Sequence, residues 1–269
     1  MPSKTKSTFI IQGLLSWILL FMILTACSKD DSKPGKDGTD SIPFNPEITY
    51  GRMNDIEDND YKTITIGSQT WMAENLRTTK YNDGTPIPEV NDNTAWSNLS
   101  TGAQCISKSA DNAEAIYGRL YNWYAVNTGK LCPQGWHVPT DQDWIILENY
   151  LIAHGYNYDP SDTTSNMIAK ALAATSFWNE YFVFGSVGSN PADNNRTGFT
   201  ALPGGVRHPD GGFNGVGEFG GWWTSTLIKP DSANQAGLAF CRQLTYASYG
   251  LEISDERLKC GLSVRCVKD

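Results

Sequence analysis

The chain has 269 residues, 40% of them hydrophobic and 19% charged, and its formal net charge is −8. This composition is typical of a globular protein and excludes collagen-like, disordered and multi-spanning membrane chains. The excess of carboxylates leaves no basic stripe to neutralise phosphates, so nucleic acid is not an expected partner. Three His and five Met offer little material for a His-rich metal site or a haem site, and we expect no cofactor or bound metal.

The N-terminal residues carry the pattern of an export signal. Two lysines precede an almost entirely apolar run over residues 9–24, which is the arrangement of a secretory signal and is short for a membrane-spanning helix. The run ends in the sequence LTAC over residues 24–27, which resembles a bacterial lipobox. We therefore expect a lipoprotein signal peptide over residues 1–26, with lipid attached to Cys27. An uncleaved membrane anchor is the alternative.

The residues after Cys27 predict a flexible tether and the location of the protein in the cell envelope. The sequence SKDD over residues 28–31 resembles the signal that sends lipoproteins of Bacteroidetes-type bacteria to the outer face of the outer membrane. Residues 28–46 contain three Pro and two Gly but few large apolar side chains, so they cannot offset the entropy of ordering. We expect a flexible tether over residues 27–46, an outer-membrane location facing the cell exterior, and one domain over residues 47–269.

The first predicted element of this domain is a β-hairpin. Residues 61–66 alternate in side-chain character, Gly67 and Ser68 offer a two-residue turn, and residues 69–72 continue as the second strand.

Two helices are expected next. Thr140 is a good N-cap for a helix over about residues 141–153, whose Trp144 and Leu147 begin an apolar face. A second helix is expected from about residue 164 to residue 174, because its apolar spacing suits packing on a sheet.

Beyond residue 176 the helical pattern disappears. Short strand-like segments alternate with Gly, Asn and Pro, at residues 199–202, 222–227, 237–244 and 262–267. The second half of the chain is therefore predicted to be mostly sheet and long loops, and the fold class to be α+β.

Five cysteines follow Cys27: Cys105, Cys132, Cys241, Cys260 and Cys266. Export permits disulfides, and an odd number leaves at least one thiol free or paired outside the chain. Several connectivities fit the spacing. One of them, Cys132 with Cys266, would join the segment before the first helix to the last strand and so tie both ends of the core.

Five motifs stand in order along the domain. They are Ile66-Gly67-Ser68-Gln69-Thr70-Trp71-Met72-Ala73-Glu74-Asn75-Leu76, Tyr117-Gly118-Arg119-Leu120-Tyr121-Asn122-Trp123-Tyr124, Cys132-Pro133-Gln134-Gly135-Trp136-His137-Val138-Pro139-Thr140, Gly198-Phe199-Thr200-Ala201-Leu202-Pro203-Gly204-Gly205 and Gly261-Leu262-Ser263-Val264-Arg265-Cys266-Val267. Together they resemble the Fibrobacter succinogenes major paralogous domain, over about residues 55–269.

This resemblance implies a C-type-lectin-like fold. In that fold two helices pack on a twisted antiparallel sheet, the N- and C-terminal strands pair, and long loops carry the binding surface. It also implies two disulfides, Cys132 with Cys266 and Cys241 with Cys260, which leaves Cys105 unpaired.

The calcium-binding triplets of sugar-binding lectins, Glu-Pro-Asn or Gln-Pro-Asp with Trp-Asn-Asp, are missing from the chain. The resemblance therefore implies the scaffold and argues only weakly for sugar binding. The acidic residues between 55 and 60 lack the spacing of a calcium-binding loop and are interpreted as a solvated turn.

The segment between Cys241 and Cys260 is the predicted ligand-binding loop. Tyr and Ser supply contact area and adaptable hydrogen bonds, as they do in antibody loops, and this region faces ligand on lectin-like scaffolds. A solvated hairpin is the alternative. Some surface lipoproteins of this fold are diversified in this region by retroelements, which is a further hypothesis here. The predicted ligand-binding residues are Trp222, Trp223, Arg242, Tyr246, Tyr249, Glu252 and Asp255.

Two patterns raise enzymatic or cofactor alternatives. Residues 215–220 match GxGxxG, but no strand precedes them and no helix follows, so an irregular loop is favoured over a dinucleotide site. The C-terminal motif also resembles the end of formylglycine-generating enzymes, which bind copper through two cysteines, and Cys260 and Cys266 are the candidates. Two structural disulfides are the favoured interpretation.

The sequence thus predicts a non-catalytic surface lipoprotein that binds an extracellular glycan or protein. A structural component of a surface assembly is the alternative, and a copper-cysteine enzyme is the third hypothesis.

Overall fold

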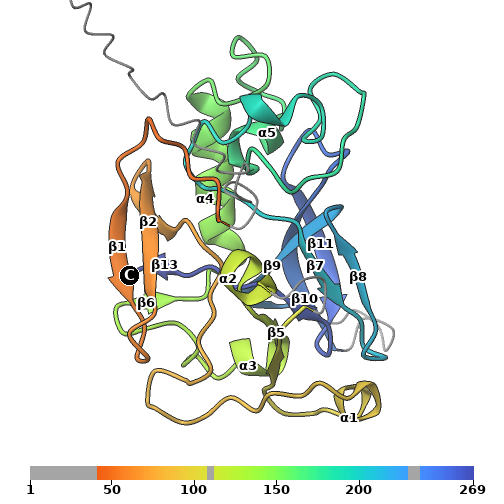
Figure 1. The fold of residues 1–269 in the computed structure, drawn as a ribbon. Helices are drawn as coiled ribbons and strands as arrows, with labels where there is room; N and C mark the ends of the chain where they lie inside the picture. Colours follow the sequence, from red (N-terminus) through yellow and green to blue (C-terminus); the bar gives the residue numbers. More distant parts are fainter. Residues whose placement is uncertain (1–40, 108–111, 230–236) are drawn as a thin grey trace, which may run out of the picture. The chain divides into compact units, whose positions relative to one another are not determined.

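Two mostly antiparallel sheets flank a single long helix in the computed structural model, which describes residues 41–107, 112–229 and 237–269 (Figure 1). The predicted signal peptide, Cys27 and the tether up to residue 40 lie outside the described residues. Among the described residues, none of the helices has the length and apolar character needed to cross a membrane.

The first sheet contains the predicted hairpin. Its strand order is β1-β2-β3-β13-β6, with the bounds β1 Gly51–Asn54, β2 Asp60–Ile66, β3 Gln69–Met72, β6 Trp136–His137 and β13 Val267–Lys268. Ile66 pairs with Gln69 across the two-residue turn, where Gly67 has a φ of 61° that favours glycine. Val267 pairs with both Trp71 and His137, so the last strand lies between strands from the first half of the domain.

The second sheet has the order β11-β10-β9-β7-β12-β5-β4, and β8 pairs with β7. Its bounds are β4 Gln104–Cys105, β5 Leu120–Asn122, β7 Gly204–Arg207, β8 Phe213–Val216, β9 Phe219–Leu227, β10 Leu238–Thr245, β11 Glu252–Arg257 and β12 Gly261–Leu262. Residues 215–220 are predicted to form an irregular loop, but they contain the end of β8, a two-residue turn and the start of β9. Because no helix follows these residues, the GxGxxG pattern has no helix N-terminus to receive a pyrophosphate.

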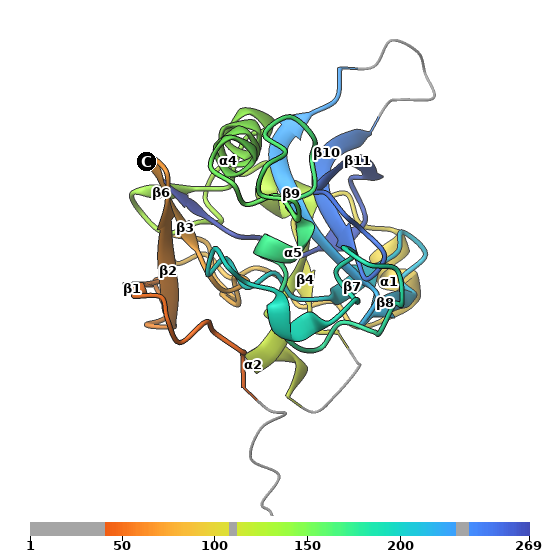
Figure 2. The same cartoon turned by 90° about the horizontal axis from the view of Figure 1, so that it is seen from above.

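Helix α4, Asp141–Ala153, confirms the first helix prediction. Thr140 caps it, and Thr140 and Asp143 form a reciprocal capping box. The helix lies against β9 and β10 (Figure 2). The other helices have at most five residues: α1 Asn93–Ser97, α2 Ala113–Tyr117, α3 Trp123–Val126, α5 Ala169–Leu172 and the 3₁₀ turn Pro191–Asp193.

The second predicted helix was too long. Of residues 164–174, only the single turn of α5 is helical. The residues before α5 form a turn in place of a helix, because Asp162 Oδ1 accepts hydrogen bonds from the backbone N–H groups of Thr164 (2.9 Å) and Ser165 (3.0 Å). Side chains of this type compete with helical hydrogen bonds.

Two of the predicted strands differ from the structure. Residues 199–202 form only an isolated bridge between Ala201 and Ala173, because Thr200 has a left-handed φ of 58° that strand geometry excludes. The predicted strand 262–267 is split into β12 and β13. Between them the carbonyls of Val264 and Cys266 accept hydrogen bonds from the loop after β3 and from β3 itself.

The N-terminal boundary of the domain also differs from the prediction. Residues 42–46, expected to belong to the tether, pack on the domain. The Phe44 ring contacts the Tyr50 ring (centroids 5.3 Å apart) and lies under the ammonium of Lys62. Asn45 Nδ2 donates to the carbonyl of Asn195 (2.9 Å). The tether therefore ends before residue 42 and not at residue 46, as its Pro-rich composition had suggested.

Taken together, the domain is a mixed α+β fold that consists mostly of curled antiparallel sheet with few helices. Its core includes a cluster of aromatic rings from Trp71, Trp144, Phe199 and Trp222, with neighbouring centroids 4.7 to 6.5 Å apart. The predicted disulfide between Cys132 and Cys266 is present, and it connects the segment before β6 to the residue before β13.

Candidate ligand-binding surface

Three of the predicted ligand-binding residues are fully buried, so their assignment to the ligand was wrong. Trp222 and Trp223 lie on β9, which has core packing on both faces. Trp222 belongs to one hydrophobic cluster and Trp223 to a second one. The buried Arg242 forms an ion pair with the partly exposed Asp141 at the start of α4 (2.7 Å). These side chains hold β9, β10 and α4 together and cannot reach a ligand.

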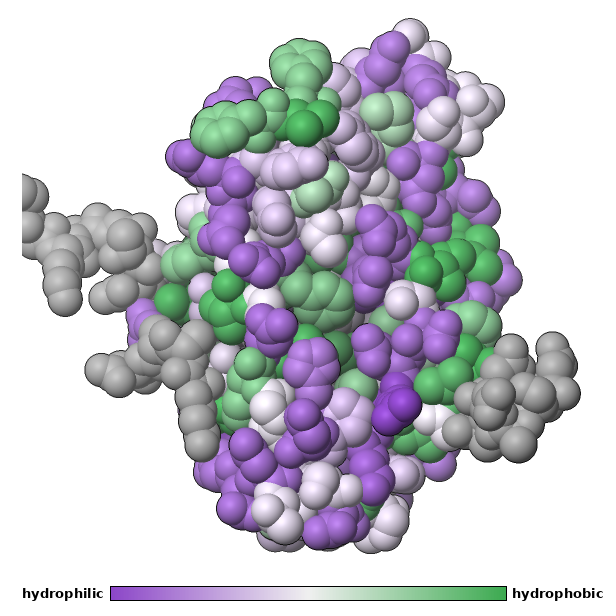
Figure 3. Space-filling model, turned by 90° about the vertical axis from the view of Figure 1, so that its right-hand side faces the viewer, coloured by the Kyte–Doolittle hydropathy of each residue, from purple (hydrophilic) through white to green (hydrophobic). Residues whose placement is uncertain are grey.

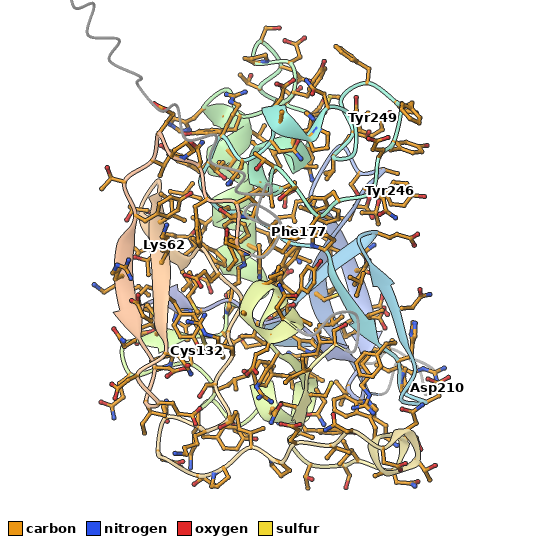
Figure 4. The ribbon with its side chains drawn as sticks, in the orientation of Figure 1. Lys62, Cys132, Phe177, Asp210, Tyr246 and Tyr249 are labelled. Carbon is orange, nitrogen blue, oxygen red and sulfur yellow. A yellow bond between two sulfur atoms is a disulfide. The ribbon has the colours of Figure 1, made fainter. Side chains whose placement is uncertain are left out.

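The remaining predicted residues lie at the surface. Tyr249 is 37% exposed, and Tyr246 is partly buried beside it in the turn between β10 and β11 (Figure 4). Glu252 begins β11 and is exposed, and Asp255 is exposed further along the same strand. The structure therefore brings Tyr246, Tyr249 and Glu252 together at one end of the hairpin, and Asp255 lies away from them.

The predicted disulfide between Cys241 and Cys260 is absent, because both residues have free, buried thiols. Cys260 Sγ donates instead to Glu256 Oε2 (3.1 Å). Burial raises the pKa of Cys241 to about 12. Cys266 is bonded to Cys132, so the pair Cys260 and Cys266 that suggested a copper site does not exist as two thiols.

An exposed aromatic loop beside the hairpin was missed by the sequence analysis. Phe182 is 92% exposed, Phe184 is 79% exposed, and Val183 between them is 43% exposed. We call residues 179–190 the aromatic loop. Hydrophobic side chains gather at the upper end of the face that carries it (Figure 3). Water-exposed large apolar side chains in a contiguous group typically mark an interaction site.

Tyrosines attach the aromatic loop to its neighbours. Tyr181 packs edge-on against Tyr246 (centroids 5.4 Å apart), and Tyr158 packs edge-on against Phe184 (5.0 Å). A Cβ at Gly185 would lie 3.2 Å from Tyr158 and 3.4 Å from Tyr249. The rings of Tyr158 and Tyr249 therefore lie close to the backbone of the aromatic loop at Gly185, which has no side chain. The rings of Tyr158, Tyr181, Phe184, Tyr246 and Tyr249, together with the exposed side chains of Phe182 and Val183, are called the aromatic surface.

Backbone hydrogen bonds join the loop to the predicted ligand-binding hairpin. The N–H of Val187 donates to the carbonyl of Ser248 (3.0 Å), and the N–H of Gly188 donates to the carbonyl of Tyr246 (2.7 Å). The loop and the hairpin turn therefore form one fixed surface.

A buried lysine holds the base of the aromatic loop. Lys170 of α5 is only 7% exposed, and its Nζ donates to the carbonyls of Ser186 (3.4 Å), Ser189 and Asn190 (3.2 Å). Burial lowers the pKa of this ammonium. The three carbonyls provide the partners that a buried charge requires.

Replacing this lysine is expected to loosen the loop. The variant Lys170→Met loses the three hydrogen bonds, and we expect it to lower the free energy of unfolding by about 2 kcal/mol. Amide hydrogen exchange over residues 179–190 should become faster. The matched control is Lys130→Met, because Lys130 is exposed and forms only a surface ion pair with Asp83, where an effect below about 0.5 kcal/mol is expected. Unchanged exchange in Lys170→Met would show that the loop is held by other contacts.

Two hollows border the aromatic surface. One, of about 330 Å³, is lined by Glu180, Tyr181 and Phe182 on one side and by residues 188–191 on the other. The second is a shallow groove of about 530 Å³, lined by Glu148, Asn166 and residues 249–253. Burial raises the pKa of Glu148. No group of three or more metal-ligating side chains occurs within the described ranges.

The sequence profile of the Fibrobacter succinogenes major domain family matches residues 64–268, which is most of the chain. The chain belongs to this family. No curated protein and no solved structure matches the chain significantly.

The motifs that are shared with the Fibrobacter succinogenes major domain meet in its core. Arg265 of the last motif is fully buried, and its Nε donates to Asn75 Oδ1 of the first (2.9 Å). Its two terminal nitrogens donate to the carbonyls of Phe199 and Thr200 of the fourth motif. Asn75 Nδ2 also donates to the carbonyl of Tyr117, the start of the second motif (2.8 Å).

The third motif joins the same core through the Cys132–Cys266 disulfide and the pairing of His137 with Val267. The family motifs therefore describe the scaffold. The aromatic loop contains none of these motifs, so membership of the Fibrobacter succinogenes major domain family does not identify its ligand.

Proposed function

We propose that this protein is a non-catalytic lipoprotein of the cell surface, and that the aromatic surface binds an extracellular ligand, a glycan or a protein. The observation that supports this proposal is the exposure of Phe182 and Phe184 on a loop whose base is fixed by Lys170 and by backbone bonds to the hairpin. Exposed aromatic side chains on a rigid base bind with a small loss of conformational entropy.

The position of this surface agrees with a C-type-lectin-like scaffold, which we propose as the finer fold assignment. In such a scaffold the long loops carry the ligand. Here the aromatic loop and the β10–β11 hairpin are both in the loop-rich second half of the domain.

The anchor is the second part of the proposal. Residues 1–26 act as the lipoprotein signal peptide, Cys27 carries the lipid, and the following residues tether the domain at the outer face of the outer membrane. The lipid then holds the chain at the membrane, because each buried methylene contributes about 0.8 kcal/mol.

A binding assay with a surface variant tests the proposed function. The chain from Gly38 to Asp269, which forms one compact unit, would be applied to arrays of glycans and of extracellular proteins, with and without EDTA. Phe182→Ser/Phe184→Ser is expected to weaken any specific binding by about tenfold or more, because two exposed contact side chains are lost. Its thermal unfolding should change little, since both side chains are largely exposed and only Phe184 contacts another ring, that of Tyr158.

The control variant is Ile56→Ser. Ile56 is 47% exposed in the turn between β1 and β2 and lines neither of the two hollows described above. Equal binding by the two variants would overturn the assignment of the aromatic surface. Co-purification of envelope proteins with no free ligand would favour a structural role in a surface assembly instead.

A further inference from the structure

Three carboxylates border the aromatic surface. Glu180 lines the hollow beside Phe182, and Glu148 and Glu252 line the groove beside Tyr249. Within the described part of the chain, no Lys or Arg forms an ion pair with any of the three. The negative charges of Glu180 and Glu252 therefore face the hollows uncompensated, whereas that of Glu148 is offset in part by the buried guanidinium of Arg242, which lowers the pKa that burial raises.

The hydrogen bonds that two of these carboxylates receive come from neutral groups. Asn166 Nδ2 donates to Glu148 Oε1 (2.5 Å), and Ser248 Oγ donates to Glu252 Oε1 (2.8 Å). Such bonds orient the carboxylates but leave their charge in place.

Cationic side chains are missing from both linings. Neither hollow is bordered by a Lys or Arg of the described residues. The buried ammonium of Lys170 donates to the loop carbonyls and is used in holding the loop. The whole chain has a net charge of −8, so the long-range field also attracts cations.

We propose that the aromatic surface docks a cationic segment of another polypeptide, with Lys or Arg side chains placed on the exposed rings and their charged ends at Glu180, Glu148 and Glu252. This inference rests on the proposed function and specifies its ligand class. Ammonium and guanidinium groups are attracted to the faces of aromatic rings within about 6 Å. Their aliphatic stems cover apolar surface while the charge stays at the polar rim, which matches apolar rings bordered by carboxylates.

The same charges disfavour other occupants. An anionic glycan or an anionic lipid surface would meet uncompensated carboxylates, because like charges placed together at an interface cost free energy. A neutral glycan would use the rings and the hydrogen-bonding groups and would gain nothing from the charge.

The experiment compares three peptides of equal length: a Lys/Gly peptide, a Gln/Gly peptide and a Glu/Gly peptide. Neutral glycans and vesicles of zwitterionic or anionic lipid are tested beside them. Binding to the unit Gly38–Asp269 is measured by fluorescence anisotropy, or by co-sedimentation for the vesicles, at low and at high salt. We expect the Lys/Gly peptide to bind best, and its affinity to fall by about tenfold or more as salt screens the charges.

Two variants separate a local site from general attraction. Glu180→Gln/Glu252→Gln removes two border charges and keeps their shape, and we expect it to weaken binding of the Lys/Gly peptide by about tenfold. Asp58→Asn/Ile56→Ser is the control, because Asp58 and Ile56 are exposed in the β1–β2 turn. Asn tolerates the positive φ of 61° at residue 58. The control should bind as the unchanged chain does.

Each outcome decides between the two proposals. Equal weakening in both variants would mean general attraction to an acidic protein and would overturn the inference. A neutral glycan or a lipid vesicle is the other possible ligand. If Phe182→Ser/Phe184→Ser abolishes its binding and Glu180→Gln/Glu252→Gln does not, the proposed cationic partner is wrong. The aromatic surface then remains the binding site. If binding of every probe is indifferent to Phe182→Ser/Phe184→Ser, the proposed function fails together with the inference.

Discussion

Removal of the Cys132–Cys266 disulfide is expected to lower the free energy of unfolding by about 5 kcal/mol. The bond joins residues 134 positions apart, so its loss frees a long loop in the unfolded chain. It also connects the segment before β6 to the residue that precedes β13, the strand that pairs with both β3 and β6. The variant Cys132→Ala/Cys266→Ala, unfolded in denaturant, measures the effect.

The control for this prediction keeps the disulfide and changes another buried cysteine. Cys105 is free and fully buried, and Cys105→Ala removes one small apolar group at a cost of about 1 kcal/mol. A double variant no less stable than Cys105→Ala would mean that strand pairing alone holds β13 in place.

Replacement of Arg265 by Met is expected to cost about 3 kcal/mol of stability. The guanidinium is fully buried and donates to Asn75 Oδ1 and to the carbonyls of Phe199 and Thr200. It also stacks on the Phe199 ring, with its central carbon 4.4 Å from the centroid. Burial lowers its pKa to about 9, so Arg265 remains charged at neutral pH.

Met is the informative substitution because it nearly fills the volume and leaves the carbonyls of Phe199 and Thr200 without a donor, whereas Asn75 Oδ1 still accepts from Trp222 Nε1 (2.9 Å). Desolvation of the buried charge is relieved at the same time, which limits the loss. The measurement is chemical unfolding, with Arg52→Met as the control. Arg52 is exposed and forms a surface ion pair with Asp60, where a loss below about 1 kcal/mol is expected. Equal stability of the two variants would show that Arg265 does not organise the core.

Local patterns predicted the elements that depend on near neighbours in the chain. The hairpin predicted over residues 61–72 and the capped helix α4 are confirmed, because alternation, turn residues and capping act over a few positions. The second helix was overestimated, since Asp162 captures backbone N–H groups that a helix would use. The segment 199–202 failed as a strand because Thr200 takes a left-handed conformation around the carbonyls that Arg265 binds.

The candidate site was predicted only in part. Tyr246, Tyr249 and Glu252 do lie together at the surface, whereas Trp222, Trp223 and Arg242 are buried. Trp222 and Trp223 are adjacent, so their side chains point to opposite faces of β9, and both faces are covered by core. The aromatic loop had one local signal, the apolar sequence YFVF over residues 181–184 amid Gly, Asn and Ser. Such a run is equally consistent with a short buried strand.

The sequence by itself determined the family, the α+β class, the hairpin and helix α4, whereas the Cys132–Cys266 pair was only one of several connectivities and was implied by the family resemblance. These follow from short-range patterns and from motifs that pack on one another. The tertiary structure alone decided which aromatic side chains face water, which carboxylates lack a partner, and which cysteines remain free. Exposure, charge balance and thiol pairing depend on contacts between residues far apart in the chain, and those contacts exist only after β9, β10 and the aromatic loop have come together.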